Sequence, residues 1–411
     1  MGAAKRDMMR RDELGYSLGP DTHVCMTCIE DSALGEIVEA NLASDTCDYC
    51  GRMNKQKLIA APLNDVIEHI AVCINRDYTI PENELPHDSA EGGFQGTVMT
   101  GSELFDDIGF SVENEELQDD ISSSFNGQLW CEENYFGLKR PERQRYGWDG
   151  FKNIVKHVRR FTFWSVHDAQ EDEPESIPAG QILREIGKAI LEARLIRHME
   201  VGQSYFRARV HVPTENLTGD TDLCPPPAEK AFQPNRMSPS GIVMFYGAED
   251  FTTACVETVE AKDRTDGKAV TVGVFQTPRP LDLLDLAELP EMPSYFDLEK
   301  REARLALMFL YQFRRDLAQP IVRDGHEHID YVPTQVFTEF IRYQFRTDQG
   351  GPVHGIRFPS AKNGKPNVVL FCGQAECIED PDDHRVSRWL KLDPSKTKTE
   401  IAAKLPIEWD K

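Results

Sequence analysis

The hydrophobic residues of this chain fall into stretches with a helical period and shorter stretches typical of strands. Helical spacing predicts helices at residues 57–78, 148–164, 181–199, 295–318 and 332–346. Alternating or continuous apolar residues predict strands at residues 204–212, 242–246, 269–277 and 367–373. In the C-terminal half these elements do not alternate regularly, which favours an α+β fold over a doubly wound parallel sheet.

The segment after the 242–246 strand predicts a short helix with an acidic residue on it. Asp250 is placed to cap this helix, and the apolar residues that follow it form a single stripe. Glu257 falls outside the stripe. The local pattern alone therefore predicts that Glu257 is a surface residue.

Four of the ten cysteines are grouped, and their spacing predicts a metal site. Cys25, Cys28, Cys47 and Cys50 form two Cys-x2-Cys pairs, which is the arrangement of a tetrathiolate zinc site. Gly51 follows the second pair and can supply the positive φ that such a knuckle favours. Two disulfides or four unrelated thiols are the alternatives. Because four thiolates leave no open coordination position, we expect a structural zinc ion rather than a catalytic one.

Composition restricts the partners and the location. The net charge of −23 argues against nucleic acid and anionic membranes as partners. The sequence has no apolar run of bilayer length, and its first 20 residues have no hydrophobic core of a secretion signal. We therefore expect a soluble, cytoplasmic protein. A homo-oligomer is left open.

Several catalytic motifs are absent from the sequence, including the Walker loop, the dinucleotide fingerprint, the G-x-S-x-G elbow and H-E-x-x-H. Arg160 and His167 have a spacing seen in helical ribonuclease modules. Two such residues often occur at this spacing by chance, and the acidic chain argues against RNA as a substrate.

Four stretches of the C-terminal half, in order, resemble the RES domain of bacterial toxins that consume NAD+. They read SYFRARV, RMSPSGIVMFYGAEDFTTACVETV, YVPTQVFTEFIR and GIRFPSAKNGKPNVVLF. The resemblance covers roughly residues 180–380. The preceding Cys-rich part is similar to the N-terminal module that is often fused to RES domains.

The resemblance implies four catalytic positions. Glu257 corresponds to the family's glutamate, Tyr246 to its tyrosine and Ser360 to its serine. Arg207 corresponds to its arginine, with Arg209 as the alternative. A carboxylate at Glu257 would stabilise positive charge on the ribose, and Tyr246 would pack on nicotinamide. Arg207 or Arg209 would bind the diphosphate, and Ser360 would orient a ribose or phosphate oxygen.

The resemblance also implies the domain organisation and the reaction. We expect a zinc-knuckle segment at 1–55, a mostly helical module at 56–178 that ends in an acidic linker, and a RES-like domain at 179–411. The last would have a fold like that of ADP-ribosyltransferases. The helix at 295–318 belongs to an insertion that either covers the pocket or carries a regulatory surface.

The expected activity is that of an NAD+ glycohydrolase or phosphorylase, acting as a toxin or defence effector that an antitoxin or another regulatory protein restrains. Two alternatives stay open. One is ADP-ribosyl transfer to a macromolecule. The other is an inactive RES-like domain in a chain that binds RNA or protein through its zinc knuckle.

Overall fold

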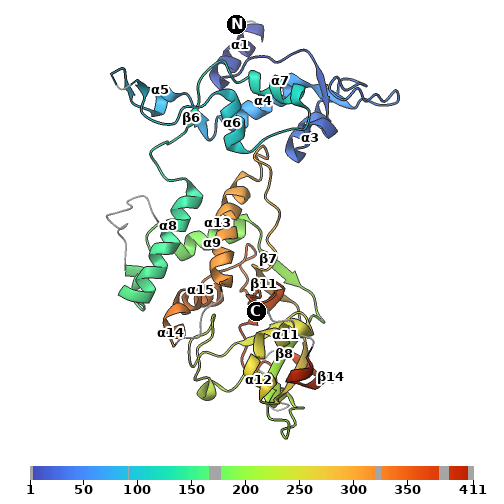
Figure 1. The fold of residues 1–411 in the computed structure, drawn as a ribbon, viewed down its shortest axis with the longest axis vertical. Helices are drawn as coiled ribbons and strands as arrows, with labels where there is room; N and C mark the ends of the chain where they lie inside the picture. The colour runs from blue at the N-terminus through green and yellow to red at the C-terminus, as the bar shows by residue number, and fades with distance from the viewer. Residues whose placement is uncertain (1–2, 91, 166–176, 320–324, 379–387, 406–411) are drawn as a thin grey trace. The chain divides into compact units, whose positions relative to one another are not determined.

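The computed structural model describes residues 3–90, 92–165, 177–319, 325–378 and 388–405 (Figure 1). Two compact units result: one contains Met1–Leu138 and Met292–Arg304, and the other contains Lys139–Glu291 and Leu305–Lys411. This grouping differs from the expected limits, because residues 139–178 belong with the later part of the chain and residues 292–304 with the earlier part. The domain limits expected from the sequence stay a prediction. Most of the acidic linker expected at 168–178 lies outside the described residues, as does His167.

The first unit is built mainly from short helices. They are α1 Ala3–Leu14, α2 Met26–Ile29, α3 Ser32–Ala40, α4 Leu63–Ile74, α5 Pro81–Glu84, α6 Gly101–Ile108 and α7 Glu115–Ser123. Three two-stranded sheets join them, formed by β1 His23–Cys25 with β2 Ala60–Pro62, β3 Tyr78–Thr79 with β6 Cys131–Glu132, and β4 His87–Asp88 with β5 Gly93–Phe94.

The core of the first unit forms around α4. Its residues Val66, Ile67 and Ile70 have no exposed surface and pack with the aromatic rings of Phe105 and Phe125. The helix predicted at 57–78 is thus confirmed for its central part, whereas residues 60–62 form β2.

The second unit is built on an eight-stranded mixed sheet with the order β14-β10-β8-β9-β13-β12-β11-β7. The strands are β7 Ile196–Met199, β8 Ser204–His211, β9 Phe245–Ala248, β10 Ala269–Gln276, β11 Leu281–Asp285, β12 Gly355–Pro359, β13 Pro366–Leu370 and β14 Lys391–Ile401. Only β11 and β12 are parallel neighbours in this sheet. The absence of regular βαβ alternation agrees with the α+β class expected from the sequence.

Helices pack against this sheet, most of them on one face. The elements are α8 Arg140–Asn153, α9 Ile182–Glu192, α10 Asp220–Leu223, α11 Phe251–Thr258, α12 Ala261–Thr265, α13 Arg301–Ala318, α14 Glu327–Asp330 and α15 Val332–Tyr343. Of these, α8, α9, α13 and α15 form a layer whose buried residues pack on Leu284, Ile356 and Val369 (Figure 1). Because side chains alternate along a strand, Leu283 and Val368 point to the opposite face, into a separate cluster.

Three predicted elements have different limits in the structure. The predicted helix at 181–199 ends at Glu192, because Arg194 adopts a φ of 53° and residues 196–199 pair with β11 as a strand. The helix at 295–318 begins only at Arg301. Only residues 148–153 of the helix predicted at 148–164 belong to α8, which starts at Arg140 and passes into a π-helical turn at Ile154–Val158.

The strand predicted at 242–246 is also displaced. A turn in which Ile242 N–H donates to the Pro239 carbonyl keeps the first part of the apolar run out of the sheet. The strand therefore runs from Phe245 to Ala248, where it pairs with β13.

Within the described ranges, no helix combines the length and the apolar character needed to cross a bilayer.

Candidate active site and cysteine cluster

Glu257 lies in the last turn of α11, and its carboxylate is held from two sides. Asp250 caps the start of this helix, as its sequence predicts, by accepting the Thr253 N–H at 2.9 Å. Ser360 Oγ donates to Glu257 Oε1 at 2.5 Å, and Asn367 Nδ2 donates to the same oxygen at 2.9 Å. Among the described residues no hydrogen bond uses Glu257 Oε2. One carboxylate oxygen is therefore fixed while the other stays available.

Ser360 is oriented by the loop that follows β12. The residue is 4% exposed, and its Oγ accepts hydrogen bonds from the backbone N–H of Lys362 at 3.1 Å and of Asn363 at 3.3 Å. Because these two N–H groups occupy the lone pairs of Oγ, its own hydrogen points to Glu257. Ser360 therefore acts as a donor to the carboxylate.

An ion pair ties β12 to the segment that enters α11. Arg357 is 3% exposed, and its guanidinium contacts both carboxylate oxygens of Glu249, at 2.7 and 2.9 Å. Such a two-pronged pair fixes orientation as well as distance. It holds the strand that leads to Ser360 against the helix that carries Glu257.

Glu257 faces a cavity of about 780 Å³. Arg207 and Tyr246 also line this cavity, so the structure brings together three of the four predicted catalytic residues in its wall and the fourth, Ser360, directly behind Glu257. The volume lies within the range of roughly 300–1,000 Å³ that is typical of small-molecule sites. The expectation from the local pattern that Glu257 is a surface residue is wrong, because Glu257 is half-buried beside β13 and the Ser360 loop.

Arg207 lies on β8, where this strand meets β9. The two strands pair only at Phe206 and Ala248, and the Arg207 side chain bridges the adjoining space by donating from Nη1 to the Tyr246 carbonyl at 2.8 Å. Burial lowers the pKa of its guanidinium. The alternative, Arg209, is exposed and donates to the Asp222 carbonyl instead. The geometry favours Arg207.

Tyr246 is held by its hydroxyl group. The Tyr246 hydroxyl and Ser238 Oγ are 2.9 Å apart, and Ser238 is 2% exposed. Burial raises the pKa of Tyr246 to about 12, so this hydroxyl is neutral at physiological pH. The ring therefore presents an uncharged aromatic surface to the cavity.

The cavity contains a second arginine that the sequence analysis did not single out. Arg236 donates to the carbonyls of Leu317 and Gln319, both at 2.7 Å, and burial lowers the pKa of its guanidinium. In the described part of the chain, neither Arg236 nor Arg207 has a carboxylate within 4.0 Å. Two half-buried cations without ion-pair partners favour an anionic ligand in this cavity.

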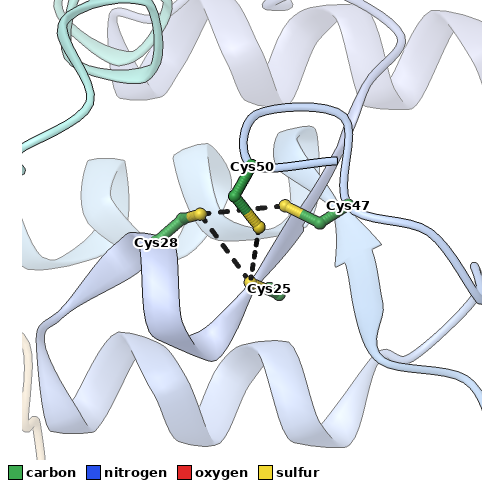
Figure 2. Close-up of side chains that lie close together, drawn as sticks. All are labelled: Cys25, Cys28, Cys47 and Cys50. Atoms are coloured by element: carbon green, nitrogen blue, oxygen red, sulfur yellow. Dashed lines mark hydrogen bonds between the residues drawn. The ribbon is translucent and has the colours of Figure 1, made fainter. Parts of the chain in front are cut away.

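The four grouped cysteines meet in the first unit, as their spacing predicts. Cys25 ends β1, Cys28 lies on α2, and Cys47 and Cys50 belong to a turn in which Gly51 has a φ of 66° (Figure 2). The sulfur atom of Cys25 lies 3.7 Å from that of Cys28 and 3.8 Å from that of Cys50. All four sulfur atoms lie within 4.8 Å of one another.

The cysteine cluster has the geometry of a metal site. Its closest sulfur atoms are too far apart for disulfides, which need about 2.0 Å, so the disulfide alternative is wrong. Burial raises the pKa of Cys28, whereas a hydrogen bond from the Arg52 backbone N–H lowers the pKa of Cys50 to about 7. Four thiols around one centre could bind a metal ion.

Comparison with known families agrees with this arrangement. Residues 208–392 match the family model of the RES domain. The chain contains a RES domain. Residues 40–169 match a second family, the HEPN/RES N-terminal domain 1, which confirms the expected fusion of an N-terminal module to a RES domain. No curated protein and no solved structure matched the chain.

The RES domain match includes most of the candidate site. Tyr246, Glu257 and Ser360 lie inside the matched range, and Arg207 lies one residue before it. Arg236 and Asn367 also lie inside it. Both residues begin stretches that the sequence pattern singles out: Arg236 begins RMSPSG, and Asn367 begins the strand predicted at 367–373. The pattern does not indicate that Arg236 lines the cavity or that Asn367 contacts Glu257.

Proposed function

We propose that the RES domain breaks the bond between nicotinamide and ribose in NAD+. The observation that carries this proposal is the Glu257 carboxylate, which is held at Oε1 by Ser360 and Asn367 in the wall of a cavity of about 780 Å³ that Arg207 and Tyr246 also line. A fixed carboxylate with one available oxygen suits a reaction in which positive charge develops beside it.

The chemistry follows from the way this bond breaks. Its electron pair leaves with nicotinamide, which departs as a neutral molecule, and the ribose ring acquires positive charge. Glu257 stabilises that charge more strongly than it stabilises the bound substrate, and this difference accelerates the reaction. Water then adds to the ribose carbon and releases a proton, giving ADP-ribose, or phosphate adds there and gives its phosphorylated form.

The remaining side chains bind and orient the substrate. The neutral Tyr246 ring packs on the nicotinamide, and Arg207 binds the diphosphate. Arg236 adds a second positive charge to the same cavity. We further propose that the α+β domain is similar in plan to ADP-ribosyltransferases, and that a partner protein restrains the loss of NAD+ by blocking the cavity.

We propose zinc as the metal of the cysteine cluster. With a zinc–sulfur bond of about 2.3 Å, the edges of a tetrahedral tetrathiolate site measure about 3.8 Å. Three sulfur pairs have separations of 3.7, 3.8 and 3.8 Å. Cys25, Cys28, Cys47 and Cys50 would fill all four positions, so this ion stabilises the fold and takes no part in the cleavage.

Free nicotinamide released from NAD+ by the purified full-length chain tests the proposed reaction. We expect nicotinamide to appear in step with NAD+ loss. Parallel reactions with and without inorganic phosphate distinguish hydrolysis from phosphorolysis, and added protein acceptors report ADP-ribosyl transfer. If no nicotinamide appears under any of these conditions, the domain is inactive and a binding role takes its place.

A further inference from the structure

A second cavity, of about 470 Å³, adjoins the first. The two cavities share Arg207, Asn235 and Tyr246 in their walls. Among the described residues, Glu257 lines only the first cavity. The two cavities therefore meet at Arg207, and only the first one reaches the Glu257 carboxylate.

The wall of the second cavity is part apolar and part polar, and it includes an aromatic ring. Ile242, Val243 and Met244 contribute aliphatic surface, and Phe232 contributes its ring. Phe232 is 78% exposed, so it adds little to the core of the domain. A planar ring with a free face is a platform on which a nucleic acid base can stack.

The loop that carries Phe232 is fastened at both ends. Gly241 N–H donates to the Ala231 carbonyl at 2.8 Å, and Ser240 Oγ donates to the Phe232 carbonyl at 2.9 Å. The Gln335 side chain on α15 also donates to the Asn235 carbonyl, at 2.9 Å. These bonds hold the loop in place while the Phe232 ring stays at the surface.

We propose that this second cavity binds the adenosine end of NAD+, with the adenine ring stacked on Phe232. The inference rests on the proposed function of the first cavity. If the nicotinamide ribose lies at Glu257 and the diphosphate lies at Arg207, the second nucleoside must continue past Arg207. The second cavity adjoins Arg207 and does not have Glu257 in its wall. Phe232 thereby selects a dinucleotide over a mononucleotide.

Two substrates of different length test this inference in the full-length protein. NAD+ has the adenosine end, whereas nicotinamide mononucleotide has the same scissile bond without it. We expect Phe232→Ala to raise the KM for NAD+ about tenfold with little change in kcat, as expected from the loss of one base stacked on an aromatic ring. The same substitution should leave the cleavage of nicotinamide mononucleotide unchanged. An equal loss with both substrates would mean that Phe232 supports the fold, and would overturn the inference.

Phe161 provides a matched control. It is a phenylalanine of the same unit that is 79% exposed and lines neither cavity, so Phe161→Ala should change neither substrate's kinetics. Calorimetric binding of ADP, which requires no turnover, separates the inference from the proposed reaction. If the parent protein cleaves neither substrate, the proposed function fails. A tenfold weaker ADP affinity in Phe232→Ala would then still support the adenosine site, and an unchanged affinity, or no ADP binding by the parent, would overturn it.

Discussion

The cysteine cluster and the Glu257 cavity hold their functional groups in opposite ways. Cys25, Cys28, Cys47 and Cys50 come from two short segments, three of them are buried and Cys50 is exposed, and a shared metal ion would hold the four thiols together. Glu257, in contrast, is fixed by Ser360, Asn367 and the helix and strands that carry them. In the first arrangement the stability of the fold depends on the metal ligands, whereas in the second the surrounding fold positions the reactive group.

This difference predicts which substitutions affect folding and which affect chemistry. Removal of a cysteine ligand should damage the fold of the first unit and leave the cavity residues in place. Substitutions around Glu257 should do the reverse. Each experiment below therefore needs both a melting curve and an activity measurement.

The largest effect is expected from Cys47→Ser. Structural zinc contributes on the order of 10 kcal/mol to the folding of small zinc domains, and loss of one thiolate weakens the site severely. Metal analysis should find one zinc ion per parent chain and none in the variant, and the melting of the first unit should occur at a much lower temperature. The buried Cys73 lies outside the cluster, so Cys73→Ala should keep the zinc ion. A metal-free parent protein with an intact first unit would contradict this account.

Arg207→Lys should weaken NAD+ binding with less effect on turnover. Lysine keeps the charge but loses the planar fork that can bind two phosphate oxygens at once. A hydrogen bond to a charged group contributes about 1.5–3 kcal/mol. The loss of one such bond should therefore raise the Kd for NAD+ roughly tenfold or more. Titration calorimetry with NAD+ measures the change. Arg209→Lys is the control and should bind as the parent does; the opposite ranking of the two variants would assign the binding role to Arg209.

The smallest effect is expected from Asn367→Ala. This substitution removes one of the two donors to Glu257 Oε1 and leaves the Ser360 bond in place. The loss of one hydrogen bond from a neutral donor costs about 1 kcal/mol, so turnover should fall roughly fivefold. Asn363→Ala removes a side chain that donates to Thr253 at 3.0 Å and does not reach Glu257, and it should preserve the rate. Equal rates in Asn367→Ala and the parent would show that the carboxylate needs no such positioning.

Local spacing could predict the cysteine cluster and most of the secondary structure, but it could not predict the cavity. The positions of Cys25 to Cys50, the positive φ of Gly51 and the cap at Asp250 all follow from neighbours in the sequence. The pairing of β13 with β9, which brings Asn367 to Glu257, depends on contacts between distant segments. For the same reason an amphipathic stripe on α11 could not reveal that its polar side faces a cavity. The resemblance to a family supplied what the local pattern lacked.

Strand and helix limits were missed where a turn competed with the hydrophobic pattern. The run at 242–246 is apolar enough for a strand, but the turn at Pro239 and Gly241 holds its first residues in the wall of the second cavity. The end of the 181–199 helix was missed because apolar residues continue past Arg194, and only the pairing of β7 with β11 shows that they belong to the sheet.

The turnover rate of Glu257→Gln is the most direct test of the central claim that this carboxylate stabilises charge on the ribose. Glutamine keeps the size of the side chain and can still accept the Ser360 and Asn367 hydrogen bonds, but it has no negative charge. We expect the affinity for NAD+ and the melting temperature to change little and kcat for nicotinamide release to fall by about 10²-fold or more. A variant that releases nicotinamide at the parent rate would contradict the account.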